Sequence, residues 1–308
     1  MSKKFLAAIA FAGAIGVALS GCAGDPLASD EGASSQPDSG TIAIGSANFP
    51  ESELLAEMYA QAIEAAGVEV ERTFNIGARE LYLAALEDGS IDLLPEYNGA
   101  LLSALVDGGA PEGVTSPEDV YDALQDVMPD GIVTLPQSEA QDKDTLSVTA
   151  ETAEQYGLET IEDLEPVAGE LSIAAGPEWA ERYVGLIGLK ELYGVEFGEF
   201  KPLDAGGPLT LEALLSGEAD VANIFSTDSA IETEGLVVLE DTKSLYLAEN
   251  IVPIIRESKL TDEVEEALNG VSEALTTENL TEYLAKVQVD KQDSASVATE
   301  FLTEYGLL

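Results

Sequence analysis

The chain has 308 residues, and its composition becomes that of a folded protein at about Thr41. From there the sequence pattern alternates between strands and helices. Ile42 and Ile44 alternate with smaller residues, as in a half-buried strand, and the apolar residues that follow recur at helical spacing up to Gly67. Asn48, three residues before Glu51, is the expected helix cap. The predicted elements are strands over residues 41–45, 68–74 and 91–94 and helices over residues 50–66 and 79–88. This order predicts a parallel β-α-β-α-β unit.

The same alternation returns in the middle of the chain. The predicted elements there are strands over residues 171–174 and 219–225 and helices over residues 177–192 and 210–215. A short internal repeat accompanies them, in which Ala85, Leu86, Gly89, Ile91 and Asp92 have the same spacing as Ala213, Leu214, Gly217, Ala219 and Asp220. In each copy a helix would stop at the glycine and lead into a buried strand, although a generic α/β turn can produce the same spacing.

Two such units followed by helical sequence from Asp262 onwards predict a two-lobed α/β protein. We assign residues 41–145 and 247–308 to lobe I and residues 146–246 to lobe II. Ligands of open parallel sheets lie beyond the carboxyl ends of the strands, so the ligand site is expected in the cleft between the lobes. A hinge between the lobes would close that cleft.

The amino-terminal segment predicts export from the cytoplasm. Residues 1–21 have the pattern of a signal peptide, with Lys3 and Lys4 before an apolar run over residues 5–19. A membrane-spanning anchor is the alternative, but the run is shorter than the ~20 apolar residues that a spanning helix needs. Residues 22–40 consist mainly of small and polar residues and predict a flexible tether.

Cys22 is the only cysteine of the chain, and it directly follows the predicted signal peptide. The sequence Leu19, Ser20, Gly21, Cys22 resembles the lipobox of bacterial lipoproteins, which implies that the Cys22 sulfur carries a lipid. Such a lipid would anchor the mature protein without a spanning helix. An ordinary signal peptide followed by a free thiol is the alternative.

Composition excludes several classes of function. The chain has 59 acidic and 13 basic residues, a balance that argues against binding of nucleic acid. It has no histidine, which removes histidine-based triads, histidine-bound zinc and the commonest general base. A single cysteine forms no thiolate cluster, and no phosphate-binding glycine loop is present, so neither a metal nor a cofactor is expected. A hydrolase that uses two carboxylates is the enzymatic alternative.

Four segments of the chain form a recognisable set, namely residues 45–51 (GSANFPE), 89–99 (GSIDLLPEYNG), 176–182 (GPEWAER) and 225–228 (FSTD). Together and in this order they resemble the glycine betaine, carnitine and choline-binding proteins of osmoprotectant ABC importers. The resemblance implies a type II periplasmic-binding-protein fold and a small zwitterionic or quaternary-ammonium solute as ligand. It also implies an ABC permease and its ATPase as membrane partners. We therefore expect a monomeric binding lipoprotein on the outer face of the cytoplasmic membrane, not an enzyme.

The resemblance also implies how the ligand is held. Aromatic rings would surround the quaternary ammonium, which has no hydrogen-bond donor, while a basic or polar cluster would hold a carboxylate. Tyr97 matches a tyrosine of the aromatic cage, Arg182 matches the arginine at the carboxylate, and Phe225 stands where the family has an aromatic residue near the Ser-Thr-Asp segment. The expected ligand-binding residues are Asn48, Phe49, Tyr97, Asn98, Asp144, Arg182, Phe225, Asp228 and Asn250.

Some positions depart from the family pattern. Ala47 and Ala100 stand where the family has a lysine and a threonine that help to hold the carboxylate. Asp144 and Asn250 stand where further cage tyrosines are expected. The departures leave the identity of the ligand open, with an amino acid or another small polar solute as an alternative. A sensory or adhesive lipoprotein without a transporter is a further alternative, since a fold does not determine a function.

The lipid anchor can be tested directly. We predict that Cys22→Ser releases the protein from membranes or leaves it unprocessed, because the lipid is the only anchor that the sequence predicts. Membrane and soluble fractions compared by immunoblot measure this, with Ser34→Ala in the tether as the matched control. Unchanged membrane attachment of the Cys22→Ser variant would contradict lipidation.

Overall fold

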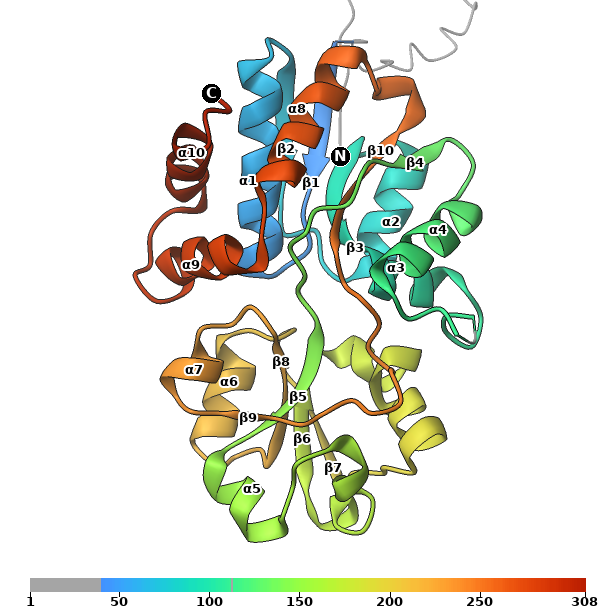
Figure 1. Ribbon diagram of the computed structural model, residues 1–308, viewed down its shortest axis with the longest axis vertical. Coiled ribbons are helices and arrows are strands. Elements are labelled where there is room, and N and C mark those ends of the chain that lie inside the picture. Colours follow the sequence, from blue (N-terminus) through green and yellow to red (C-terminus); the bar gives the residue numbers. More distant parts are fainter. Residues whose placement is uncertain (1–39, 112) are drawn as a thin grey trace, which may run out of the picture. The chain divides into compact units, whose positions relative to one another are not determined.

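The computed structural model describes residues 40–111 and 113–308, and within them the chain builds two five-stranded sheets (Figure 1). The first sheet contains β1 (Thr41–Gly45), β2 (Glu69–Thr73), β3 (Leu93–Tyr97), β4 (Ile132–Thr134) and β10 (Ile251–Arg256). The second contains β5 (Asp144–Val148), β6 (Ser172–Ala175), β7 (Glu199–Pro202), β8 (Val221–Phe225) and β9 (Val237–Val238). Among these residues, no helix combines the length and the apolar character that crossing a membrane requires. The predicted signal peptide and Cys22 lie outside the described residues.

The β-α-β-α-β unit predicted at the start of the folded region is present. Strand β1 pairs in parallel with β2 and β3, and α1 (Pro50–Ala65) and α2 (Arg79–Asp88) connect them. The predicted cap is wrong, because Phe49 occupies the N-cap of α1 and no side chain caps the helix. Pro50 explains the shift, since its fixed φ suits the first helical position and places Phe49 immediately before it.

The internal repeat has the same structure in both sheets. In the first sheet the carboxylate of Asp92 accepts from the backbone N of Ala43 at 3.0 Å. In the second, after α6 (Pro208–Leu215), the carboxylate of Asp220 accepts from the backbone N of Ser172 at 2.8 Å. Both glycines of the repeat adopt positive φ, 82° and 71°, a conformation that favours glycine. Each copy therefore ends a helix and ties the next strand to its parallel neighbour.

Each sheet also contains one strand that the chain enters directly after leaving the other sheet. Strand β5 comes directly after the first sheet's β4 and pairs antiparallel with β8, whereas β10 comes after the second sheet's β9 and pairs antiparallel with β3. The chain thus crosses between the sheets twice (Figure 1). This arrangement confirms the predicted two-lobed α/β class, and the lobe limits near residues 145 and 247 stay a prediction.

The continuous helix predicted over residues 177–192 is wrong. The segment is broken into a 3₁₀ turn (Pro177–Ala180) and two π-helical turns (Tyr183–Ile187 and Leu189–Tyr193). Arg182 has an extended backbone, with φ −87° and ψ 147°, and Gly185 is also outside the helical region. A Cβ on Gly185 would lie 2.2 Å from a backbone oxygen, so close packing of the backbone enforces the irregular path.

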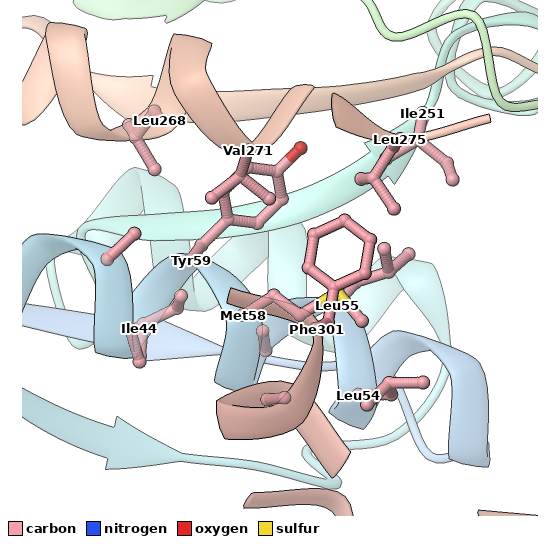
Figure 2. Close-up of a cluster of buried hydrophobic side chains, with 14 of the residues drawn as sticks. Ile44, Leu54, Leu55, Met58, Tyr59, Ile251, Leu268, Val271, Leu275 and Phe301 are labelled. Carbon is pink, nitrogen blue, oxygen red and sulfur yellow. The ribbon is translucent and has the colours of Figure 1, made fainter. Parts of the chain in front are cut away.

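The helical tail packs against α1 of the first sheet. It consists of α8 (Asp262–Ala274), α9 (Thr277–Gln288) and α10 (Ser294–Glu304), all of which contact α1. Figure 2 shows Phe301 of α10 beside Leu55 and Met58 of α1, and all three side chains are fully buried. The other helices are α3 (Asn98–Leu105), α4 (Pro117–Val127), α5 (Ala150–Tyr156) and α7 (Ala230–Thr233).

We predict that Phe301→Ala lowers the free energy of unfolding by about 3–5 kcal/mol, because it opens a cavity in the core that joins the tail to α1. Leu209→Ala, at a position that is 62% exposed, should change it by less than about 0.5 kcal/mol. Urea unfolding followed by circular dichroism measures both. Equal effects of the two changes would show that α10 is not part of this core.

Candidate ligand-binding site

A cavity of about 60 Å³ lies at the carboxyl ends of parallel strands from both sheets. Phe49 follows β1, Tyr97 ends β3, Trp179 follows β6 and Phe225 ends β8, and all four line the cavity. Residues after parallel strands meet at one edge of each sheet, which is why segments far apart in the sequence gather here. The cavity is therefore at the place where an α/β protein of this topology binds a ligand.

Three aromatic rings form one wall of the cavity. The ring centroid of Phe49 lies 6.1 Å from that of Tyr97 and 5.2 Å from that of Phe225, with the ring planes tilted by 34° and 43°. Tyr97 is buried, whereas Phe49 and Phe225 are half-buried. Phe225 comes from the second sheet and the other two from the first, so the aromatic wall is assembled only when both sheets are in contact.

The structure brings six of the predicted residues together. Those that line the cavity are Asn48, Phe49, Tyr97, Asp144, Arg182 and Phe225. Asn98 and Asn250 do not line it, because they bind each other: each backbone N donates to an oxygen of the other, at 3.0 and 2.8 Å. Asp228 also lies outside the lining, where its carboxylate accepts from the backbone N of Ala230.

Arg182 lies between two carboxylates rather than alone. Its Nε and Nη2 donate to both oxygens of Glu80 at 3.1 and 3.0 Å, and its Nη1 lies 3.9 Å from the carboxylate of Glu178. Glu80 belongs to α2, whereas Arg182 follows β6. The ion pair therefore joins elements of the two sheets at the wall of the cavity.

Arg79 is the basic residue of the cavity lining that the sequence analysis missed. It is the first residue of α2 and only 8% exposed, and its Nε and Nη2 donate to the carboxylate of Glu96 at 2.7 and 3.0 Å. A signal was present in the sequence, since a cation in the first turn of a helix opposes the helix dipole and needs a specific partner. That partner, Glu96, is in the segment around Tyr97 that resembles the family.

Two carboxyl groups of the cavity wall are poorly solvated, with Glu249 buried and Asp144 half-buried. Asp144 accepts from the side chain of Asn223 at 2.8 Å, and Glu249 accepts from the backbone N of Ala100 at 2.8 Å. Burial raises the pKa of both groups, and the negative charge of Asp144 raises the pKa of Glu249 further. The wall thus combines aromatic rings with carboxyl groups that are poorly solvated and face a small enclosed space.

A buried hydrogen-bond network beside the cavity links the sheets. Glu51, at the start of α1, accepts from the Tyr97 hydroxyl at 2.7 Å and from the Thr227 hydroxyl at 2.6 Å. The backbone N of Thr227 donates to Asp142 at 3.0 Å. Burial raises the pKa of Glu51 and of Asp142, and the negative charge of Glu51 adds to the effect on Asp142. The Tyr97 hydroxyl is therefore part of this network, and only its ring is available to a ligand.

The fold and the cavity define a two-lobed solute-binding protein, with a cavity that residues of both α/β sheets line. Residues 40–304 match the family of substrate-binding domains of ABC-type glycine betaine transport systems, and the chain belongs to that family. It is thus a substrate-binding protein of an ABC transport system. Such proteins act outside the cytoplasm and deliver a small solute to a permease.

Individual relatives agree with this assignment. The chain is 28% identical to a glycine-betaine-binding protein of Pseudomonas aeruginosa, over 87% of this chain and 89% of the relative. It is 26% identical to a carnitine transport binding protein of Listeria monocytogenes, over 85% and 86%. A solved glycine betaine/carnitine/choline ABC transporter structure has a TM-score of 0.66 at 25% identity, covering 86% of this chain and 99% of that one. A choline-binding protein in complex with choline shares the fold, with a TM-score of 0.64 at 17% identity, over 87% and 89%.

We predict that Glu51 makes folding stability decrease as the pH rises. Because burial raises its pKa, the folded protein holds the proton more tightly than the unfolded chain does. The stabilisation that this proton gives is complete below the ordinary glutamate pKa and is lost as the pH rises through the raised value. The free energy of unfolding of the wild type, relative to that of Glu51→Gln, should therefore fall as the pH rises above the ordinary glutamate pKa.

Urea unfolding at a series of pH values measures this difference. Glu118→Gln, which changes an exposed carboxylate on α4, is the matched control and should show no comparable trend. A wild type that gains stability relative to Glu51→Gln as the pH rises would contradict the buried, proton-holding role of Glu51.

Proposed function

We propose that this protein captures a small quaternary-ammonium solute, such as glycine betaine, carnitine or choline, in the cavity between its sheets and delivers it to an ABC permease. The observation that carries the proposal is the aromatic wall of Phe49, Tyr97 and Phe225, to which both sheets contribute. A methylated ammonium has no hydrogen-bond donor, so ring faces and apolar contact are its natural partners. The family and the named relatives support the same class of ligand.

The charge of the cavity wall supports a ligand with a cationic end. Carboxyl groups of Asp144, Glu178 and Glu249 line the cavity, and its two arginines are already paired with Glu96 and Glu80. A cation would therefore enter a space lined by carboxyl groups, of which Asp144 and Glu249 form no ion pair with either arginine. Its charge would favour the ionised form of these poorly solvated groups, because little water screens the attraction.

The cellular setting is part of the proposal. Residues 1–21 would be removed as a signal peptide, and a lipid on Cys22 would hold residues 22–40 as a tether at the outer face of the cytoplasmic membrane. The monomer would be the functional unit, with residues 41–145 and 247–308 as one lobe and residues 146–246 as the other. The cavity lining comes from both sheets, which supports opening and closing of the lobes around the ligand.

We propose that the solute is bound and released without chemical change. The alternative is a hydrolase that uses two carboxyl groups, such as Glu51 with Asp142 or Asp144 with Glu249 near the cavity. Turnover of a substrate would be needed to support that alternative. Incubation of the purified protein with glycosides and with each candidate solute, followed by analysis for products, distinguishes a binder from a hydrolase.

The central experiment is a thermal-shift screen of the tether-free protein, residues 40–308, with glycine betaine, carnitine, choline and proline. A bound ligand raises the melting temperature according to its affinity and concentration. Isothermal titration calorimetry then gives the dissociation constant of each solute that shifts the temperature. Failure of every quaternary-ammonium solute to bind, with an intact melting transition, would overturn the proposed ligand class.

We predict that Phe49→Ala weakens binding of the quaternary-ammonium solute about 3- to 30-fold, because one ring face contributes about 0.5–2 kcal/mol. Phe49→Tyr should bind nearly as well as the wild type, since it keeps the ring. Phe200→Ala, a change in β7 outside the cavity lining, is the control for general loss of packing. Calorimetry with the solute found in the screen provides the measurement, and unchanged affinity of Phe49→Ala would argue against the aromatic wall.

A further inference from the structure

We infer that Arg79, held in place by Glu96, receives the anionic end of a zwitterionic ligand and so determines whether the protein prefers a carboxylate-bearing solute. The inference rests on the proposed function and assigns a role that the resemblance gives to Arg182. It starts from the need for a cation in the cavity. Arg79 and Arg182 are the basic residues among those that line the described cavity.

Arg182 is the less available of the two. Both Nε and Nη2 are bound to Glu80, and Nη1 lies closest to Glu178, so each of its nitrogens faces a carboxylate of the protein. Its Nη1 makes no hydrogen bond in the described part of the chain but lies 3.9 Å from Glu178, so a ligand carboxylate there would meet the repulsion of that carboxylate. Arg182 is thus suited to holding the two sheets together around a ligand.

Arg79 is held rigidly and keeps a free donor. Glu96 is completely buried and accepts from Arg79, from the Tyr82 hydroxyl at 2.7 Å and from the backbone N of Tyr97 at 2.8 Å. These contacts fix the guanidinium without using its Nη1, which has no hydrogen-bond partner in the described part of the chain. A planar guanidinium whose orientation is already fixed loses little freedom when it binds a carboxylate.

The surroundings of Arg79 favour an anion in two further ways. Arg79 is the first residue of α2, and the N-cap residue Ala78 has no side chain that could accept from the helix's first backbone N–H groups. Gly77 and Ala78 line the cavity together with Arg79, so the positive end of the helix dipole faces the same space. Ala47 and Ala100 line it as well, and their small side chains leave room for the ligand's carboxylate.

The carboxyl groups of the cavity wall would repel an anionic ligand group if they were all charged. Asp144, Glu178 and Glu249 all line the cavity. Burial raises the pKa of Asp144 and of Glu249, which favours their neutral forms, and the charge of Arg79 counteracts this shift in both groups. A ligand carboxylate bound at Arg79 would therefore interact mainly with the positive charge of the guanidinium. The cationic end of the ligand would face the acidic side chains and the aromatic rings of the wall.

The test uses two ligands that share one end. Glycine betaine and choline both carry a trimethylammonium group, but glycine betaine ends in a carboxylate and choline in a hydroxyl. Isothermal titration calorimetry with both solutes is carried out on the wild type and on Arg79→Gln, Arg79→Lys and Arg182→Gln. Because Arg79→Gln leaves Glu96 buried without its partner, the double variant Arg79→Gln with Glu96→Gln is also measured, and melting temperatures without ligand confirm folding.

We expect Arg79→Gln and the double variant to bind glycine betaine about 10- to 100-fold more weakly, the effect of losing a hydrogen bond to a charged group. Choline should lose less than about 3-fold. Arg79→Lys should be intermediate, because it keeps the charge but not the planar fork. Arg182→Gln should weaken both solutes alike, since it removes a contact between the sheets and not a contact to the carboxylate.

Three results would overturn the inference while leaving the proposed function intact. They are equal losses for both solutes in the folded Arg79 double variant, a selective loss of glycine betaine in Arg182→Gln with Arg79 variants unaffected, and a wild type that binds choline but not glycine betaine. If the wild type binds no quaternary-ammonium solute at all, the proposed function fails and the inference fails with it.

Discussion

The exchange of one antiparallel strand into each sheet is the constraint on which the rest of this structure depends. Strand β5 belongs to the second sheet but follows directly from the first, and β10 makes the reverse crossing. Two crossings side by side keep the carboxyl ends of the parallel strands of both sheets directed toward one space. Phe49, Tyr97 and Phe225 meet for this reason, although no two of them are neighbours in the sequence.

The second organising feature is how the chain accommodates charge at the cavity. Each arginine there is bound by a carboxylate from the protein, Arg79 by Glu96 and Arg182 by Glu80. The first pair is buried within one sheet's elements and fixes a donor, whereas the second joins elements of the two sheets at a more exposed position. Paired charges cost less to bury than isolated ones, so the cavity can hold cationic and anionic groups together without solvation by bulk water.

The network around Glu51 has a different role. It connects α1 to the segment after β8 through hydroxyl groups and does so without a basic partner among its hydrogen-bonding residues. Burial raises the pKa of Glu51 and so favours its protonated form at this contact between the sheets. The same contact orients the Tyr97 ring, so the aromatic wall and the link between the sheets share one side chain.

Much of the fold follows from the sequence because its signals are local. The periodicity of residues 41–94 predicted the first β-α-β-α-β unit, and the glycine-aspartate repeat indicated that the same connection occurs in both sheets. The prediction of one helix over residues 177–192 was wrong because tertiary packing around Gly185 breaks the helix. The periodicity of the sequence does not show that packing. Asn48 is not the cap of α1 because Pro50 prefers the first helical position, which places Phe49 at the cap.

Part of the candidate site could likewise be predicted from the sequence, and part could not. The segments that resemble the family identified Phe49, Tyr97, Arg182 and Phe225, and the structure places all four in the lining of the cavity. The sequence could not decide which arginine keeps an Nη1 that no second carboxylate faces, since that depends on the carboxylates that reach it from other elements. Only the tertiary structure pairs Arg182 with Glu80 and Arg79 with Glu96, because side-chain partnerships across a fold depend on distances that no local pattern contains.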